Sequence, residues 1–169
     1  TVVNAPTGNT VAAAEHTLGL LFALARRVPA ADASMRRGEW KRSQFTGREL
    51  RGKTLGILGL GRIGFLVAED ARGLGMDVLA YDPFVPAERF HELGLKRADN
   101  PDKIYREADF ITVHLPKNAD TLGFIGDEEF AKMKDGVRVV NVARGGIVDE
   151  DAWARAIESG KVAASAVDV

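Results

Sequence analysis

Three glycines, Gly59, Gly61 and Gly64, form a G-x-G-x-x-G motif that follows an apolar run and opens a helix-like segment. In such a motif the first glycine permits a tight turn, the second lets the backbone approach a pyrophosphate, and the third allows a helix to pack closely on a strand. The amides of Arg62 and Ile63 would then face the phosphates from the positive end of the helix. The motif predicts a dinucleotide site, and the alternative is a glycine turn that binds no ligand.

Asp82 ends the next apolar run, near the spacing of about 20 residues expected for an acid that binds the adenosine ribose. Its carboxylate would accept hydrogen bonds from both ribose hydroxyls and would repel the additional phosphate of NADP. Pro83 follows it, and no arginine or lysine stands beside it to hold such a phosphate. The residue type therefore favours NAD as the cofactor. An ordinary Asp-Pro turn at the end of a strand is the alternative.

The run NVARGGIVD, residues 141–149, places Arg144 at the end of a further apolar run, followed by a pair of glycines that lets the chain turn sharply. The guanidinium group offers a planar fork of donors that matches a carboxylate. Because ligands bind outside the carboxyl ends of parallel strands, we expect Arg144 to bind the carboxylate of a substrate rather than to be a solvated surface arginine. Asp149 is expected to cap the next helix.

Two more polar residues end apolar runs in the same way. His114, in the segment His114-Leu115-Pro116, is interpreted as a wall of the cofactor cleft, with a proton carrier as the alternative. Asp168 would accept a hydrogen bond from a nicotinamide carboxamide, or would simply begin the next turn. His16 and His91 lie within predicted helices and receive no catalytic role. The sequence thus offers no convincing general base, although the oxidation of an alcohol requires one.

The elements that would position these residues alternate between short apolar runs and amphipathic segments, which is typical of a buried parallel sheet. Strands are predicted over residues 54–59, 77–82, 109–114, 137–142 and 162–168, and helices over residues 62–74, 86–93, 128–133 and 150–158. This order predicts an α/β fold, a doubly wound parallel sheet of the Rossmann type. The chain ends on a buried strand, so we interpret it as a fragment.

The first fifty residues have a different pattern. A helix of some fifteen residues has one apolar stripe, made of Val11, Ala14, Leu18, Leu21, Phe22 and Ala25, and further apolar residues at Leu20, Ala23 and Leu24. A helix that is apolar on nearly all sides is expected to be buried on more than one side, either within its own domain or in a subunit interface. The segment 36–50 is predicted to be a loop. Its Trp40 and Phe45 either form an association surface or pack back onto the domain.

Composition narrows the class of protein. The formal net charge of −1 and the mixed charges do not suggest binding to nucleic acid or to an anionic membrane. The chain has no cysteine, so it can hold neither a disulfide nor a thiolate metal site, and we expect no metal. The longest apolar stretch, 18–25, is far shorter than the roughly 20 residues that span a bilayer. With no leader pattern at the start, we expect a cytoplasmic protein.

Four segments in order carry a resemblance to a known family: AAAEHTLGLLFALAR, GKTLGILGLGRIG, ADFITVHLPKNADTLGFIG, and VVNVARGGIVDE leading to AVDV. Together they resemble the D-isomer-specific 2-hydroxyacid dehydrogenases over essentially the whole chain. The segments PAADASMRRGEWKRSQFTGREL and KDGVRVVNVARGGIVDE favour members whose small-molecule substrate is a phosphorylated 2-hydroxy acid. Members that act on glyoxylate, hydroxypyruvate or D-lactate are the alternative. A co-repressor-like protein that senses NAD is a rival from another class.

The resemblance implies a role for each matched position. Residues 1–10 would cross over from a substrate domain into an NAD-binding domain over residues 11–169, with Asn9 facing the cleft from the hinge. The implied cofactor contacts are Arg62 and Ile63 to the pyrophosphate, Asp82 to the ribose, His114, Pro116 and Thr121 along the adenosine and nicotinamide side, Ala143 near the nicotinamide, and Asp168 to its carboxamide. Arg144 would bind the substrate carboxylate and orient the oxygen on C2 for hydride transfer.

The resemblance also implies a homodimer formed through the long apolar helix and the loop around Trp40. One departure from the family pattern is large. The family's general base is a histidine paired with a glutamate, and both belong downstream of the last predicted strand. The outer substrate domain is absent as well. We therefore expect this chain to fold and to bind NAD, but not to catalyse the reaction alone.

Overall fold

Six parallel strands form the central sheet of the computed structural model, which describes residues 8–169. Their spatial order is β3-β2-β1-β4-β5-β6. The bounds are β1 (Thr54–Leu58), β2 (Asp77–Tyr81), β3 (Lys96–Arg97), β4 (Phe110–Val113), β5 (Val137–Asn141) and β6 (Val162–Val167). This is the doubly wound order, in which the chain winds outward in two directions from the middle of the sheet, so the predicted fold class is confirmed. Of the predicted hinge segment, residues 1–7 lie outside the described part of the chain.

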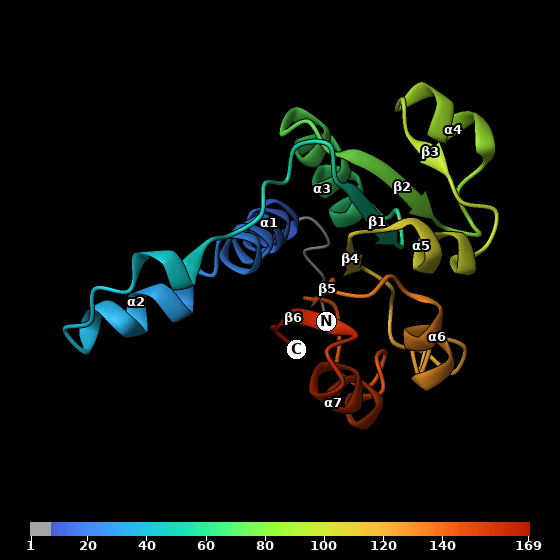
Figure 1. The fold of residues 1–169 in the computed structure, drawn as a ribbon. Helices are drawn as coiled ribbons and strands as arrows, with labels where there is room; N and C mark the ends of the chain where they lie inside the picture. Colours follow the sequence, from blue (N-terminus) through green and yellow to red (C-terminus); the bar gives the residue numbers. More distant parts are fainter. Residues whose placement is uncertain (1–7) are drawn as a thin grey trace, which may run out of the picture.

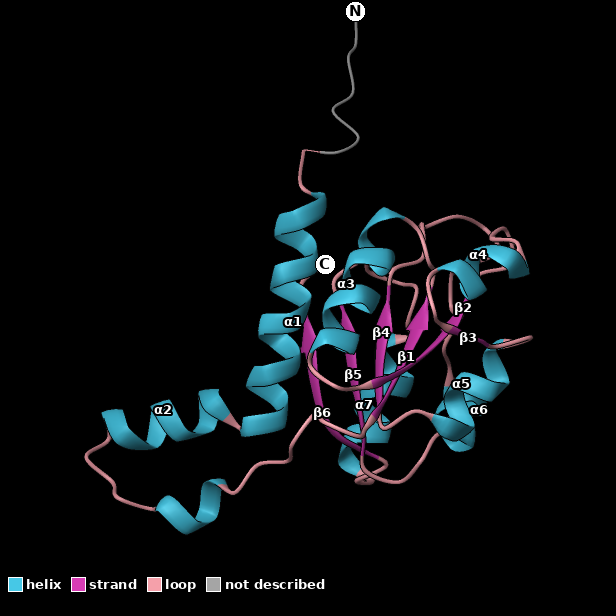
Figure 2. Cartoon of the chain, turned by 90° about the horizontal axis from the view of Figure 1, so that it is seen from above, coloured by secondary structure: helices cyan, strands magenta, loops and turns pink. Residues whose placement is uncertain are grey.

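Helices cover both faces of the sheet (Figures 1 and 2). On one face, α1 (Thr10–Arg26) packs against α3 (Arg62–Gly73), β5 and β6. On the other face lie α5 (Pro101–Glu107), α6 (Asp127–Lys132) and α7 (Glu150–Glu158), while α4 (Ala87–Glu92) packs beside β3. Each face has its own apolar core, because strands covered on both sides are buried on both sides.

The strand register brings the carboxyl ends of the strands to one edge. Leu58 pairs with Tyr81 on one side and Val113 on the other, and Asn141 pairs in turn with Val113 and Val167. Every predicted strand ends one residue earlier than expected. The residues left over are the first ones of the edge loops, Gly59, Asp82, His114, Val142 and Asp168. Four of these five are predicted site residues, so the register gathers candidates from distant parts of the sequence.

Several elements were not predicted. Helix α5 begins with Asn100, whose side chain accepts a hydrogen bond from the Lys103 amide at 3.2 Å, and with Pro101 in the first turn. Both residues are standard helix-start signals. The edge strand β3 consists of two charged residues and has no apolar signature. The bounds of α3, α4, α6 and α7 agree with the prediction to within one residue.

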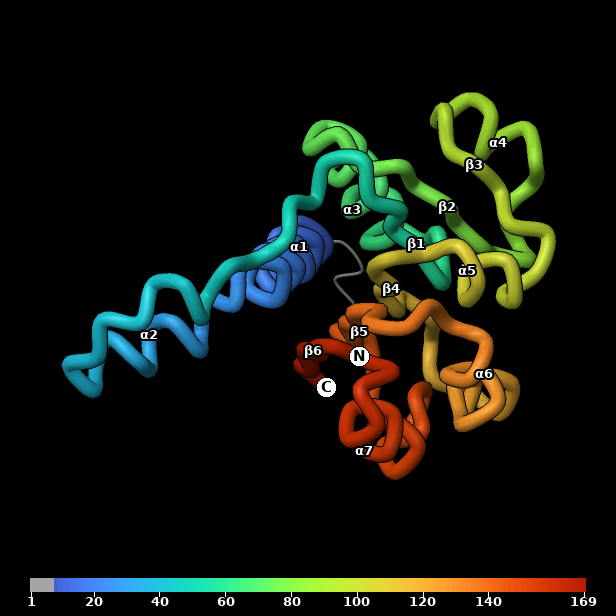
Figure 3. Tube along the Cα trace, viewed as in Figure 1, coloured from blue at the N-terminus to red at the C-terminus, as the bar shows by residue number. Residues whose placement is uncertain are grey.

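An arm projects from the body of the molecule. It consists of α2 (Val28–Arg36), the short helix η1 (Arg42–Phe45) and a return segment that runs back alongside α2 (Figure 3). Arg27 turns the chain from α1 into α2. Its φ is 55°, and it is the one non-glycine residue with positive φ among residues 8–169. The prediction of a loop over 36–50 is therefore only partly right.

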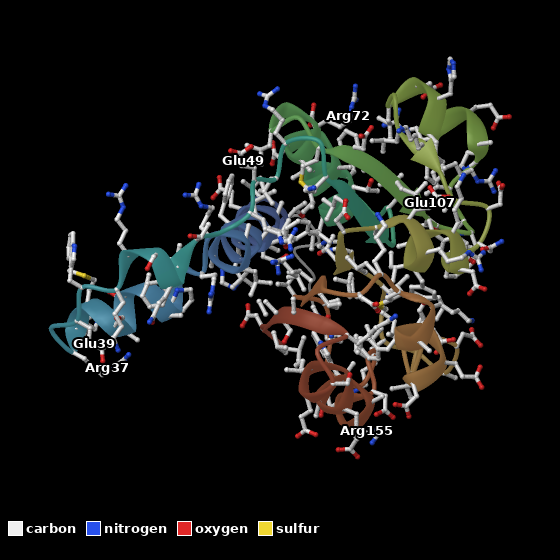
Figure 4. The ribbon with its side chains drawn as sticks, in the orientation of Figure 1. Arg37, Glu39, Glu49, Arg72, Glu107 and Arg155 are labelled. Carbon is white, nitrogen blue, oxygen red and sulfur yellow. The ribbon has the colours of Figure 1, made fainter. Side chains whose placement is uncertain are left out.

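The tip of the arm is held by Glu39, which is shown with Arg37 at its outer end in Figure 4. Its carboxylate accepts hydrogen bonds from Arg37 and from the Ser34 hydroxyl, the latter at 2.8 Å. Arg37, Ser34 and Lys41 lower the pKa of Glu39 to about 2. The arm therefore has internal interactions of its own, although little of it contacts the sheet.

Helix α1 is buried on one side only. Ala14, Thr17, Leu21 and Ala25 are buried against the sheet and α3, while the side chains of Val11 and Phe22 are 59% and 43% exposed. The alternative in which α1 is covered on several sides within its own domain is thus wrong, and the alternative of a subunit interface stays a prediction. Across residues 8–169, no helix combines the length and the apolar character needed to cross a membrane.

Candidate dinucleotide and substrate site

The glycine motif lies between β1 and α3 and has the geometry that its spacing predicts. Gly59 has φ 96°, a conformation that favours glycine, and a side chain there would also meet the His114 carbonyl at 2.8 Å. A side chain at Gly64 would overlap the Gly59 carbonyl oxygen. At Gly61, by contrast, an added Cβ meets nothing within 4 Å. The first and third glycines are required by the fold, whereas the space beside Gly61 is open for a ligand.

The amino end of α3 faces this open space. Gly61 is the N-cap residue and has no side chain to cap the helix, and the first turn, which begins with Arg62 and Ile63, contains no acidic residue. The partial positive charge of the helix end is therefore not neutralised by a carboxylate of its own first turn. A pyrophosphate is the kind of group that such an end binds.

Asp82 is linked to the glycine loop. Its Oδ2 atom accepts a hydrogen bond from the Leu60 amide at 2.8 Å, and its Oδ1 atom accepts one from the Phe84 amide at 2.9 Å. The side chain is half-buried at the end of β2. Because each carboxylate oxygen has two acceptor sites, two remain for the hydroxyls of a ribose.

His114 follows β4 and lies against the glycine loop. Its amide donates to the Leu58 carbonyl at 2.8 Å, and its Nε2 atom is 2.9 Å from the hydroxyl of the buried Thr112. Burial lowers the pKa of His114 to about 4. The ring is therefore neutral near pH 7, which suits a cleft wall better than a proton carrier.

Pro116 and Thr121 belong to the turn that continues from His114. The Thr121 hydroxyl donates to the Pro116 carbonyl at 2.5 Å and accepts from the Asn118 amide at 2.9 Å. Thr121 is buried. Its hydroxyl therefore shapes the loop, and any contact with a cofactor would come from the loop that it holds. Asn118, whose side chain accepts from the amides of Asp120 and Thr121, was missed in the sequence.

The loop after β5 is held by Asn141, a buried residue that received no role from the sequence. Its side-chain oxygen accepts from the Ala143 amide at 3.0 Å, and its side-chain nitrogen donates to the Arg144 carbonyl at 3.1 Å. Arg144 itself is exposed, and its Nη1 atom donates to the Ala143 carbonyl at 2.6 Å. The predicted cap at Asp149 is confirmed, since its carboxylate accepts from the Ala152 amide at 2.8 Å.

A depression of about 550 Å³ joins this loop to α1 and the end of β6. Its lining brings together four predicted residues, Asn9, Ala143, Arg144 and Asp168. It also contains His16, to which the sequence assigned no role. The His16 Nε2 atom is 3.3 Å from Asp168 Oδ2. A larger hollow of about 680 Å³ lies on the arm and is lined by none of the predicted cofactor or substrate residues.

Residues 18–169 match the model of a family described as D-isomer specific 2-hydroxyacid dehydrogenase, NAD binding domain. A curated relative, D-3-phosphoglycerate dehydrogenase of Archaeoglobus fulgidus, is 56% identical over 168 residues, which are 99% of this chain and 32% of the relative. The chain thus spans about a third of the length of that relative.

Solved structures share the fold closely. A D-lactate dehydrogenase from Aquifex aeolicus, complexed with NAD and lactic acid, has a TM-score of 0.91 and 36% identity, covering 98% of this chain and 49% of that one. A glyoxylate reductase from Paecilomyes thermophila has a TM-score of 0.89 and 39% identity, covering 97% and 49% of the two chains. The similarity therefore extends over nearly all of this chain and over slightly less than half of each of those proteins.

Proposed function

Because this chain belongs to the D-isomer-specific 2-hydroxyacid dehydrogenases, we propose that it binds NAD in an enzyme that oxidises 3-phospho-D-glycerate to 3-phosphohydroxypyruvate, a step of serine biosynthesis. The single observation that carries the cofactor assignment is the link between Asp82 and the glycine loop. It places a carboxylate suited to a ribose beside an uncapped helix end suited to a pyrophosphate. We propose a cytoplasmic enzyme, since a chain without cysteine fits a reducing compartment.

The residues that would hold the cofactor come from the five loops that follow β1, β2, β4, β5 and β6. We assign Gly59, Gly61, Arg62, Ile63 and Gly64 to the pyrophosphate, Asp82 to the adenosine ribose, His114, Pro116 and Thr121 to the cleft wall, and Ala143 and Asp168 to the nicotinamide end. When bound, the nicotinamide would accept a hydride from C2 of the substrate. A neutral His114 would keep that wall free of a competing positive charge.

Arg144 is the proposed substrate residue. It is exposed at the depression, next to Ala143 and across from Asn9, so its guanidinium can present two donors to a carboxylate. Such a bidentate pair fixes the orientation of the substrate as well as its position, and orientation is what hydride transfer at C2 requires. The loop geometry set by Asn141 would keep the arginine at the cleft.

The proton of the substrate hydroxyl needs a base, and we assign this role to none of the described residues. The chain has three histidines, of which His114 is neutral in the wall, His16 is paired with Asp168, and His91 lies on α4. We therefore propose that the base belongs to the rest of the protein. Residues 1–10 would form the crossover from a substrate domain, and residues 11–169 the cofactor domain.

The alternative substrates are the 2-oxo acids glyoxylate and hydroxypyruvate, or the 2-hydroxy acid D-lactate. The relative named for 3-phosphoglycerate is 56% identical to this chain, against 36–39% for the solved enzymes named for lactate and glyoxylate. That difference supports the phosphorylated substrate. A co-repressor-like binding protein is the less favoured reading, because no feature of residues 8–169 favours it over an enzyme.

A homodimer is the proposed assembly, with the arm in the interface. The arm exposes Trp40, Met35 and Val28 at 80%, 54% and 52%. Large apolar side chains on an element that makes few contacts with its own body are typical of a surface that a partner covers. The exposed side of α1, with Val11 and Phe22, would extend the same interface.

Two measurements test the proposal. Calorimetric titration of the chain is expected to give saturable binding of NAD and weaker binding of NADP. In the full-length protein, NAD-dependent oxidation should be faster with 3-phosphoglycerate than with D-lactate or glycolate. Arg144→Lys should lower kcat/KM by about 100-fold or more, since lysine cannot form the bidentate pair. Equal affinity for both cofactors, or turnover by the chain alone, would contradict the proposal.

A further inference from the structure

His16 and Asp168 form a pair across the depression, although they stand at opposite ends of the chain. His16 lies on α1, and Asp168 is the first residue after β6. Their side chains approach to 3.3 Å between Nε2 and Oδ2, and both are at least half exposed, at 50% and 68%. They share this depression with Arg144 and Asn9. A pair in this position borders the place where the reacting groups would meet.

The backbone of Asp168 is fixed, whereas its side chain needs a further contact. The Asp168 amide donates to the Asn141 carbonyl at 3.0 Å, which continues the strand pairing past the end of β6. The carboxylate, in contrast, stands on an exposed strand end where several rotamers are open to it. The contact from His16 to Oδ2 selects one of them. Oδ1 is then left to accept a hydrogen bond from a ligand in the depression.

Neutral histidine is sufficient for this role. A ring that carries a proton on Nε2 faces the Asp168 carboxylate with a donor, whether or not Nδ1 is protonated as well. The contact thus resembles the outer hydrogen bonds that orient ligating side chains in other sites. Its value is geometric, because a donor–acceptor pair weakens steeply when its alignment is lost.

We propose that His16 is a positioning residue, which orients the Asp168 carboxylate toward the carboxamide of the nicotinamide. This inference rests on the proposed function, since it requires NAD in the site. It adds α1 to the elements that build the cofactor site, and it predicts an effect that is confined to one chemical group of the ligand.

The test compares NAD with 3-acetylpyridine adenine dinucleotide, in which a methyl ketone replaces the carboxamide and no N–H remains for Asp168. His16→Leu should weaken the binding of NAD about two- to fivefold, the range of an exposed pair, and leave that of the analogue unchanged. His16→Gln, which keeps a side-chain donor, should restore most of the affinity. In an Asp168→Ala background, His16→Leu should have no further effect.

His91→Leu is the matched control, because His91 is an exposed histidine on α4 at the opposite edge of the sheet. It should change the affinity for neither ligand. Equal weakening of both ligands by His16→Leu would show a general structural effect and overturn the inference, as would no change in either. If the wild-type chain bound neither ligand, the proposed function itself would fail, and the inference with it.

Discussion

The Asp82 carboxylate accepts a hydrogen bond from the Leu60 amide at 2.8 Å, which ties the end of β2 to the middle of the glycine motif. One oxygen of this half-buried carboxylate thereby holds the glycine loop, and the other holds the following turn through the Phe84 amide. Asp82 therefore has one observed role and one proposed role that a substitution can separate: it shapes the loop, and in the proposed function it offers negative charge to the ribose.

Asp82→Ala should lower the affinity for NAD by about 10- to 100-fold, since hydrogen bonds to a charged group are worth about 1.5 to 3 kcal/mol. The affinity for NADP should change much less, so the preference disappears. Asp82→Asn keeps an acceptor for the Leu60 amide and should lose the preference with a smaller loss of affinity. Calorimetric titration of both variants with both cofactors measures this, and an unchanged preference in Asp82→Ala would refute the assignment.

Gly61→Ala and Gly64→Ala should separate binding from stability. The added methyl group at Gly61 meets nothing, so the free energy of unfolding should stay within about 0.5 kcal/mol of the wild type. The same group occupies the space proposed for the pyrophosphate, and NAD binding should fall at least about tenfold. At Gly64 it overlaps a backbone carbonyl, and we expect a loss of about 1 to 3 kcal/mol. Urea unfolding and calorimetry distinguish the two patterns.

His114 should make stability depend on pH. Its pKa is about 4 in the folded chain, against an ordinary value of about 6.5 in the unfolded one. Between these values the unfolded chain binds a proton that the folded chain does not. The contribution of His114 to the free energy of unfolding is therefore complete above about pH 6.5 and is lost as the pH falls toward 4. Because the ring is half-buried, this pH-dependent part of the free energy of unfolding should be on the order of 2 kcal/mol.

The comparison that isolates this effect is His114→Gln, measured by urea unfolding between pH 4 and pH 7. The difference in stability between wild type and variant should shrink as the pH falls through this range. A difference that stays constant with pH would mean that His114 titrates normally. An NMR titration of the ring gives the folded-state pKa directly.

Asn141→Ala should destabilise the chain by about 1 to 3 kcal/mol, because the Ala143 amide and the Arg144 carbonyl both lose their partner. In the full-length protein the same change should raise KM for the substrate, since Arg144 is then less firmly placed. Asn141→Asp provides the comparison: it keeps the acceptor but sets a carboxylate against the Arg144 carbonyl. Denaturation curves together with steady-state kinetics check both expectations, and an unchanged KM would argue against a role in placing Arg144.

Trp40→Ala, combined with Met35→Ala, should convert the proposed dimer to a monomer. Both side chains are more than half exposed, so the stability of the single chain should change by less than about 0.5 kcal/mol. Sedimentation velocity of wild type and double variant measures the change in assembly. A wild-type chain that sediments as a monomer at all concentrations would exclude an interface through this arm.

The sheet could be predicted from the sequence because its signals are local. Continuous apolar runs such as 54–58 mark buried strands without reference to any other part of the chain. The edge strand β3 was not predicted, because Lys96 and Arg97 are charged and pair with β2 through their backbones. Helix α2 was not predicted, because Arg27 separates it from α1 in a left-handed conformation that its residue type does not indicate.

The contacts that shape the candidate site could be predicted only in part, for a physical reason. The roles proposed for Asp82 and Arg144 follow from their residue types, and each stands where an apolar run ends in the sequence. Asn141 is hidden inside an apolar strand, and only the folded loop shows that both ends of its amide are used. His16 is hidden on a helix, since its partner stands at the other end of the chain.

The position of α1 has a consequence for synthesis on the ribosome. It precedes every other described element in the chain, yet it packs against β5 and β6, the fifth and sixth of the described strands. The apolar face of α1 therefore remains without its final cover until β6 has been translated. During that interval the nascent chain exposes Leu21 and its neighbours to solvent, which makes this helix a natural binding segment for a chaperone.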